Sequence, residues 1–220
     1  MSKKYTGNTN GTAEKIGGTV YSSQALYDNV GADAACIVAK RVEAVMLSLY
    51  SDHPYTVVVI DQRSDCPDLS TEETGCVDNK AYDEFRSYIY NGAPVVKDDF
   101  NICLTNRADS EPNDTRPLGC GSVGGNIAVA ERGPDIAGVV SKDYYEITPG
   151  GDSVMTAIHE IGHNLGMQHD VGDRNLFDPD RDGTDEEVIT PFQPGRGNEN
   201  VCGNKAADSN KDVLLEPEYD

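Results

Sequence analysis

The strongest chemical signal in the chain is the segment 159–170, which reads HEIGHNLGMQHD and contains three of the four histidines. On an α-helix, His159 and His163 lie one turn apart on the same face, so both imidazoles can reach one metal ion. Glu160 lies about 100° further round the helix. This position makes Glu160 a poor metal ligand but brings its carboxylate close to a metal-bound water.

A third nitrogen ligand comes from the end of the same motif. Gly166 lets the chain leave the helix in a conformation that other residues resist, and the turn brings His169 back toward the metal. Three protein nitrogens on Zn²⁺ leave a fourth position for water, as in catalytic zinc sites. The alternative is a helix with two core histidines and a glycine stop. However, the motif fixes five residues over eleven positions, and it would arise by chance on the order of once in 10⁵ chains of this size.

The composition restricts the partners of the protein. Its 220 residues include 38 Asp and Glu against 18 Lys and Arg, a net charge of −20. Such a charge repels nucleic acid and anionic membranes, and no apolar run approaches the roughly 18 residues of a membrane helix. We expect a monomer with no nucleic-acid partner and no membrane span. The spread of acidic residues is typical either of a halophilic source or of an ordinary acidic secreted protein.

The six cysteines favour disulfides and an oxidising compartment, because their number is even. Cys66 and Cys76 flank one polar loop, so they are the pair that we predict, and free buried thiols are the alternative. No signal peptide is visible in the first ten residues. Either the mature part begins here or the protein is not exported by that route, and we expect an extracellular protein.

Helical and strand patterns alternate along the chain, which predicts an α/β fold with a largely parallel sheet. The expected elements are, in chain order, a polar frayed end over 1–20 with a weak strand near 15–22, a helix over 32–50, a buried strand over 56–60, a helix over 81–91, a buried strand over 100–105, an irregular edge strand within 118–130, a short strand over 136–141 and the helix of the histidine motif, starting near Asp152 or Ser153. Long periodic segments end after Asp170. We therefore divide one catalytic domain into a part over 1–170 and a small, loop-rich lobe over 171–220.

The histidine motif resembles the zinc signature of the metzincin metalloproteases. The Asn after the second His and the Asp after the third make it most similar to the adamalysin, or reprolysin, branch. The resemblance implies that His159, His163 and His169 bind zinc and that Glu160 is the catalytic base. It also implies a mixed, mostly parallel twisted sheet with two large helices, the active-site helix and a small C-terminal lobe.

The resemblance extends to two further segments of the chain. Residues 118–124 (LGCGSVG) resemble the family's substrate-binding edge strand, which implies substrate contacts by four residues: Leu118, Gly119, Cys120 and Gly121. Residues 138–140 resemble the strand that follows. The family also has a turn with a methionine beneath the metal, but this chain has no methionine after Met167. Ile189 stands in the methionine's place, and Pro191 follows two residues later.

A second metal signal lies between the histidine motif and Ile189. Residues 178–185 alternate carboxylates and turn at Gly183, and Ca²⁺ takes six to eight oxygen ligands of this kind. The expected ligands are Asp178, Asp180, Asp182 and Asp185. The glutamate expected at the twelfth position of such a loop is absent, and Ile189 stands there. The alternative is a solvated acidic loop.

Two functions are compatible with these signals. The first is a zinc endopeptidase that hydrolyses polypeptides with a metal-activated water and Glu160 as general base. The second is a non-catalytic, calcium-dependent binding module on a metalloprotease fold, which the missing methionine favours. The presence of Glu160 favours the enzyme, because a binding module does not need a base beside the zinc.

Overall fold

The computed structural model describes residues 2–7, 15–49, 54–69, 79–106, 119–131, 133–137, 149–166, 174–177 and 186–189. Six strands form one mixed sheet with the order β1-β3-β2-β4-β6-β5. They are β1 (Lys3–Gly7), β2 (Ile16–Ser22), β3 (Tyr55–Val59), β4 (Phe100–Leu104), β5 (Gly119–Gly121) and β6 (Ile127–Ala130). The four central strands are parallel, and β1 and β5 are antiparallel strands at the two edges. The predicted α/β fold with a mostly parallel sheet is therefore confirmed.

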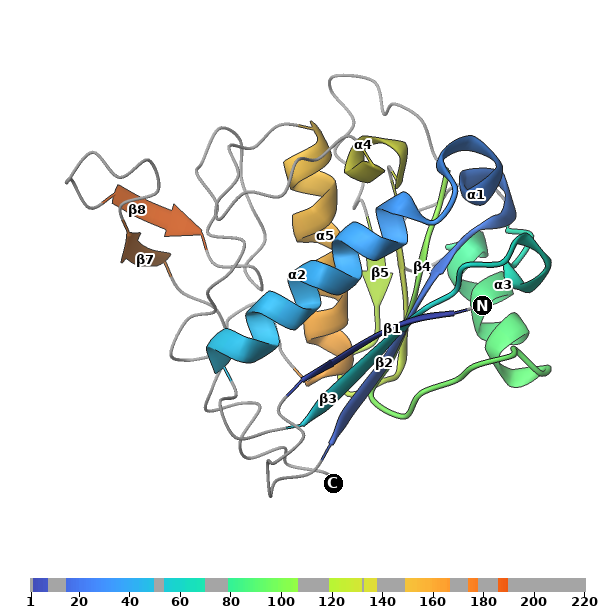
Figure 1. Ribbon diagram of the computed structural model, residues 1–220, viewed down its shortest axis with the longest axis horizontal. Coiled ribbons are helices and arrows are strands. Elements are labelled where there is room, and N and C mark those ends of the chain that lie inside the picture. The colour runs from blue at the N-terminus through green and yellow to red at the C-terminus, as the bar shows by residue number, and fades with distance from the viewer. Residues whose placement is uncertain are drawn as a thin grey trace.

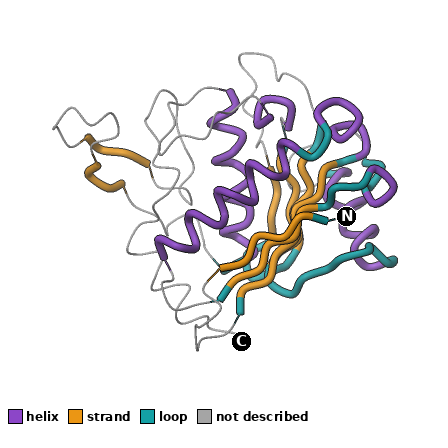
Figure 2. Tube along the Cα trace, viewed as in Figure 1, coloured by secondary structure: helices purple, strands orange, loops and turns teal. Residues whose placement is uncertain are grey.

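Helices cover both faces of this sheet. The helical elements are α1 (Gln24–Val30), α2 (Asp33–Leu49), a 3₁₀ turn (Arg63–Asp65), α3 (Lys80–Tyr90), α4 (Gly133–Ala137) and α5 (Pro149–Asn164). Figure 1 shows α2 and α5 on one face and α3 on the other, and Figure 2 shows the same layers by element type. Helix α5 packs against β4, β5 and β6, so the described part of the histidine motif, residues 159–166, lies on a helix beside the β5 edge of the sheet.

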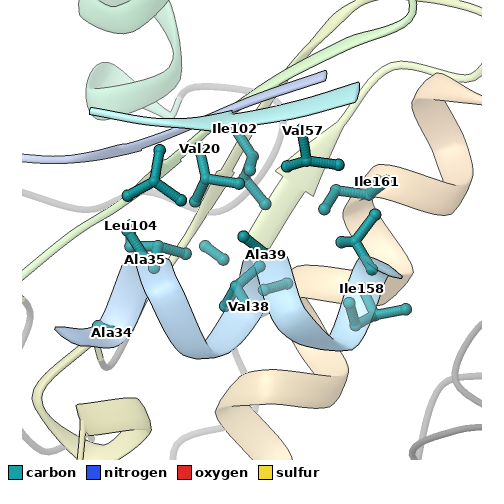
Figure 3. Close-up of a cluster of buried hydrophobic side chains, with 14 of the residues drawn as sticks. Val20, Ala34, Ala35, Val38, Ala39, Val57, Ile102, Leu104, Ile158 and Ile161 are labelled. Carbon is teal, nitrogen blue, oxygen red and sulfur yellow. The ribbon is translucent and has the colours of Figure 1, made fainter. Parts of the chain in front are cut away.

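The central strands are apolar on both faces because each face carries its own core. Alternate residues of β2, β3, β4 and β6 pack under α2 and α5, including Val20, Val57 and Ile102, and Ile158 and Ile161 of α5 belong to the same core (Figure 3). The intervening strand residues, including Tyr21, Val58 and Cys103, pack under α3 against its buried residues Phe85 and Ile89. A parallel sheet that is covered in this way gives continuous apolar runs rather than alternation. This explains why the segment 56–60 was recognisable as a strand.

Most predicted elements lie within a few residues of their observed bounds, but some predictions were wrong. The polar start of the chain contains β1, which pairs with β3; a half-exposed edge strand has little apolar periodicity. Ile136 and Ala137 belong to α4, not to a strand. Helix α5 begins at Pro149 rather than near Asp152, and proline is well suited to the first turn of a helix.

The segment 118–130, which we expected to be one irregular edge strand, contains two strands. β5 and β6 pair antiparallel, with Gly119 opposite Ala130 and Gly121 opposite Ala128. The loop between them includes Gly124, whose φ of 66° suits glycine. The expected edge strand is therefore β5 alone, and β6 is an interior strand beside β4.

Beyond Asp170 the structure describes two strands, β7 (Arg174–Phe177) and β8 (Glu186–Ile189), which form a separate antiparallel sheet. The division of the domain at residue 170 stays a prediction. Among the helices that the structure describes, none has the length and apolarity to cross a bilayer.

Candidate active site

Helix α5 brings two histidine side chains together near its C-terminal end. The imidazole rings of His159 and His163 have centroids 4.5 Å apart and planes at 75° to each other. Both residues are buried, with 9% and 7% exposed. Their helix is fixed because an apolar stripe on it, which includes Ile158 and Ile161, is packed in the core under the sheet. The two imidazoles therefore lie side by side on a rigid element, as two ligands of one metal must.

Glu160 lies on the side of α5 that faces the edge strand. A β-carbon on Gly119 would lie 2.8 Å from Glu160 Oε1, and one on Gly121 would lie 3.0 Å from Glu160 Oε2. The carboxylate is therefore packed against two strand positions that have no side chain. Burial raises the pKa of Glu160 to about 8, because the charged form loses its water.

Strand β5, which the sequence predicts to bind the substrate, is an edge strand of the sheet. It is the last strand of the sheet order and pairs with β6 on one side. An exposed sheet edge can accept a further strand through main-chain hydrogen bonds. Gly119, Cys120 and Gly121 lie on β5 as predicted, and Leu118 lies outside the described residues.

The donor set on α5 fits a zinc ion. Neutral imidazole nitrogens are common zinc ligands, and a carboxylate beside them is suited to accept a proton from water. The predicted third ligand, His169, lies outside the described residues. Within the described ranges, no three His, Cys, Asp or Glu side chains gather to hold a metal ion. The complete ligand set thus stays a prediction.

The other predicted site residues lie mostly beyond the described ranges. This holds for Asp178, Asp180, Asp182 and Asp185 of the acidic loop, for the segment 138–140 and for Pro191. Ile189 is the last residue of β8, where it pairs with Arg174. Its assignment as the counterpart of the methionine stays a prediction.

Sequence reasoning did not assign a role to Asn164, which the structure places between the helix and the edge strand. Asn164 Nδ2 donates hydrogen bonds to the carbonyl oxygens of Ser122 and Ile127, at 3.2 Å and 3.0 Å. The Gly124 amide donates to the His163 carbonyl at 2.9 Å. The sequence marks Asn164 only as a feature of the family motif, because no local pattern reveals a partner about forty positions away.

The predicted Cys66–Cys76 disulfide was wrong. Cys66 is a free, buried thiol, and Cys36 and Cys103 are free as well. The thiol of Cys66 lies 3.5 Å from the carbonyl oxygen of Gln62, so it is held within its own turn. Cys120 on β5 is disulfide-bonded. The position of Cys66 and Cys76 on either side of a polar loop therefore did not indicate a disulfide between them.

The chain is similar to several proteins of known structure. Among solved structures, the chain is similar to archaemetzincin from Methanopyrus kandleri, with 16% identity, a TM-score of 0.47, and coverage of 91% of this chain and 94% of that one. It is also similar to metalloproteinase-II from Bacteroides fragilis, with 12% identity, a TM-score of 0.49, and coverage of 93% and 53%. A search of curated proteins found no match.

The family assignment comes from a sequence model of the reprolysin-like metallopeptidases of family M12B. That model matches residues 58–170, which is just over half of the 220 residues. The match includes β5, β6, all of α5 and the three histidines of the motif. The chain belongs to the reprolysin-like M12B metallopeptidases and is a metzincin-type protease.

Proposed function

We propose that this metallopeptidase is a zinc-dependent endopeptidase that binds an extended polypeptide along β5 and uses Glu160 as its general base. The observation that supports this proposal is the position of the Glu160 carboxylate. On one side of the carboxylate is the turn of α5 that bears His159 and His163. On the other side are Gly119 and Gly121 of the edge strand. A base in this position is within reach both of a metal site on α5 and of a peptide bound on β5.

Each group has a distinct task in the proposed reaction. Zinc, when bound by His159, His163 and His169, supplies a Lewis acid that acidifies water and polarises a carbonyl. Glu160 accepts a proton from the attacking water and passes it to the nitrogen of the leaving amine.

The substrate that suits the edge strand is an unfolded or extended polypeptide. Main-chain hydrogen bonds to β5 would hold it antiparallel to the strand, and they do not depend on side-chain identity. The formal charge of −20 repels acidic peptides at low ionic strength. We therefore propose a preference for neutral or basic peptide segments.

Three further proposals depend on the sequence alone. They are calcium binding by the loop 178–185, an extracellular location and a monomeric state. The alternative function, a calcium-dependent binding module, depends on the same loop. The family match and the buried Glu160 favour the peptidase over that alternative.

The decisive experiment is hydrolysis of casein by the full chain. We expect activity that a chelator abolishes and zinc restores. Glu160→Gln should lower activity by roughly 10²–10⁴-fold while zinc content and melting temperature stay close to wild type. Glu43→Gln is the matched control, because it removes a carboxylate on α2 that accepts a hydrogen bond from Tyr55, and it should keep full activity. Glu160→Gln activity within a few-fold of wild type would exclude Glu160 as the base.

A further inference from the structure

The loop that joins β5 to β6 is attached to the last turn of α5. Asn164 Nδ2 contacts the carbonyl oxygens of Ser122 and Ile127, which stand at the two ends of this loop. Asn164 is 5% exposed. Its amide therefore bridges the end of the edge strand and the start of the next strand from inside the protein.

Further hydrogen bonds hold the middle and the outer side of the loop. The Gly124 amide donates to the carbonyl of His163, and the Gly125 amide donates to the carbonyl of Ser122, both at 2.9 Å. On the outer side, the hydroxyl groups of Tyr82 on α3 and Ser122 lie 2.7 Å apart. These hydrogen bonds hold the loop in place, and its attachment to α5 is next to His163, which we assign to the metal.

The asparagine side chain is used here for its two N–H groups. Asn164 Oδ1 is buried without a hydrogen-bond partner among the described residues. Leaving a buried acceptor unpaired has an energetic cost. An apolar residue would avoid that cost but would leave the Ser122 and Ile127 carbonyls without these donors. An asparagine at position 164 is therefore explained by its two hydrogen bonds to the loop, which offset the cost of the unpaired Oδ1.

The loop contact holds the end of β5 relative to α5. The packing of Glu160 against Gly119 and Gly121 holds the strand itself. Glu160 and Asn164 are four residues apart, so they lie one turn apart on the same side of the helix. The same face of α5 therefore carries both contacts: Glu160 sets how closely β5 approaches the helix, and Asn164 sets how β5 is aligned along it.

We infer that Asn164 is a positioning residue, which holds the peptide-binding strand β5 in register with the Glu160 carboxylate without contacting the substrate. This inference rests on the proposed function, because it assumes that peptides bind along β5. It predicts that loss of the amide donors affects long peptides more than short ones. A long peptide uses the whole strand, whereas a short one is held mainly near the scissile bond.

The test uses Asn164→Asp, which keeps the shape but removes both donors, and Asn164→Ser as a second variant in case the first does not fold. KM and kcat are measured with a peptide that spans all of β5 and with a short peptide limited to the residues beside the scissile bond. We expect kcat/KM for the long peptide to fall about tenfold more than for the short one, mainly through KM, which corresponds to about 1.4 kcal/mol. Zinc content should stay at the wild-type level.

The control is Ser23→Ala, which removes a buried cap hydrogen bond to the Leu26 amide on α1 and leaves β5 and α5 untouched. It should lower the melting temperature without changing the ratio between long and short peptides. If Asn164→Asp and Asn164→Ser behave in the same way as this control, Asn164 is only structural and the inference is wrong.

A second readout separates this inference from the proposed function. Amide hydrogen exchange at Gly124, measured by NMR in the full chain, reports directly on the loop contact with His163. Faster exchange at Gly124 in the Asn164 variants, with unchanged exchange in α2, supports the attachment even if wild type cleaves no peptide. Unchanged exchange at Gly124 would overturn it. Absence of activity in the zinc-loaded wild type would instead overturn the proposed function.

Discussion

Glu160 on α5 and Gly119 on β5 approach so closely that a β-carbon on Gly119 would lie 2.7 Å from Glu160 Cγ. It would also lie 2.9 Å from Thr156 Cγ2. Separations this short between non-bonded carbons are strongly repulsive, since the optimum is about 3.5–4.0 Å. Glu160 can therefore occupy its position only because residue 119 has no side chain. The position of the edge strand and that of the base depend on each other sterically.

Gly119→Ala should displace the Glu160 side chain or push β5 away from α5. We expect peptidase activity to fall by roughly 10²-fold, the lower end of the contribution of general base catalysis. Gly17→Ala on β2 is the matched control, because its β-carbon would meet nothing closer than Lys97 Cδ at 3.5 Å. Equal activity of both variants, at equal zinc content, would contradict the steric link.

Much of the site followed from the sequence because its geometry is local. The spacing of His159 and His163 needs only a helix to bring the rings together, and the structure supplies that helix. The central strands were recognisable for a related reason. Burial on both faces leaves a continuous apolar run, as in the segment 56–60.

The parts that the sequence did not reveal depend on contacts between distant segments. The packing of Gly119 and Gly121 against Glu160 joins positions about forty residues apart, and glycines in a strand equally suggest bulges or weak pairing. β1 was missed because its edge position needs no apolar pattern. Ile136 was placed in a strand because a five-residue helix is too short for helical periodicity to be visible.

His163→Ala should reduce the zinc content of the purified protein, because it removes one of three predicted nitrogen ligands. The remaining imidazole of His159 would keep its place on α5, so residual weak binding is expected at high zinc concentration. Metal analysis after dialysis against a weak chelator measures the effect. One tightly bound zinc per chain in the variant would show that His163 is not a ligand.

The free thiols should differ in reactivity as a function of pH. Burial raises the pKa of the Cys66 thiol to about 11, and burial raises the pKa of Cys103 well above its usual value. The thiolate is the reactive form, so both should resist alkylation in the folded protein near pH 8.5. Cys36 is only partly buried, and its sulfur accepts a hydrogen bond from Lys3 at 3.3 Å, so it should react first. Mass spectrometry of the modified peptides checks this order.

The same pKa values predict a loss of stability in alkali. The unfolded chain ionises these thiols near the ordinary cysteine pKa, whereas the folded protein keeps Cys66 protonated up to about 11. The folded state then binds more protons, so the free energy of unfolding falls as pH rises through this window. Cys66→Ala should flatten that part of the stability curve. An unchanged slope between pH 9 and 11 would contradict the assignment to Cys66.

The last prediction concerns the acidic segment 178–185, which lies in the sequence between β7 and β8. If Asp178, Asp180 and Asp182 bind Ca²⁺ together, the ion offsets their mutual repulsion. It then stabilises the folded state and not the unfolded state. Such binding adds RT ln(1 + [L]/Kd), about 2.7 kcal/mol at a hundredfold excess of ligand over Kd. The melting temperature should therefore rise with millimolar Ca²⁺ at constant ionic strength, and Asp180→Ala should abolish the rise.

Monovalent salt provides the comparison that decides between a site and a surface effect. NaCl should also raise the melting temperature, because it screens repulsion over the whole chain of net charge −20. The Asp180→Ala variant still has nearly all of that charge, so it should keep its response to NaCl while losing its response to Ca²⁺. If Ca²⁺ stabilises wild type no more than NaCl of equal ionic strength, residues 178–185 are a solvated acidic loop and do not form a calcium site.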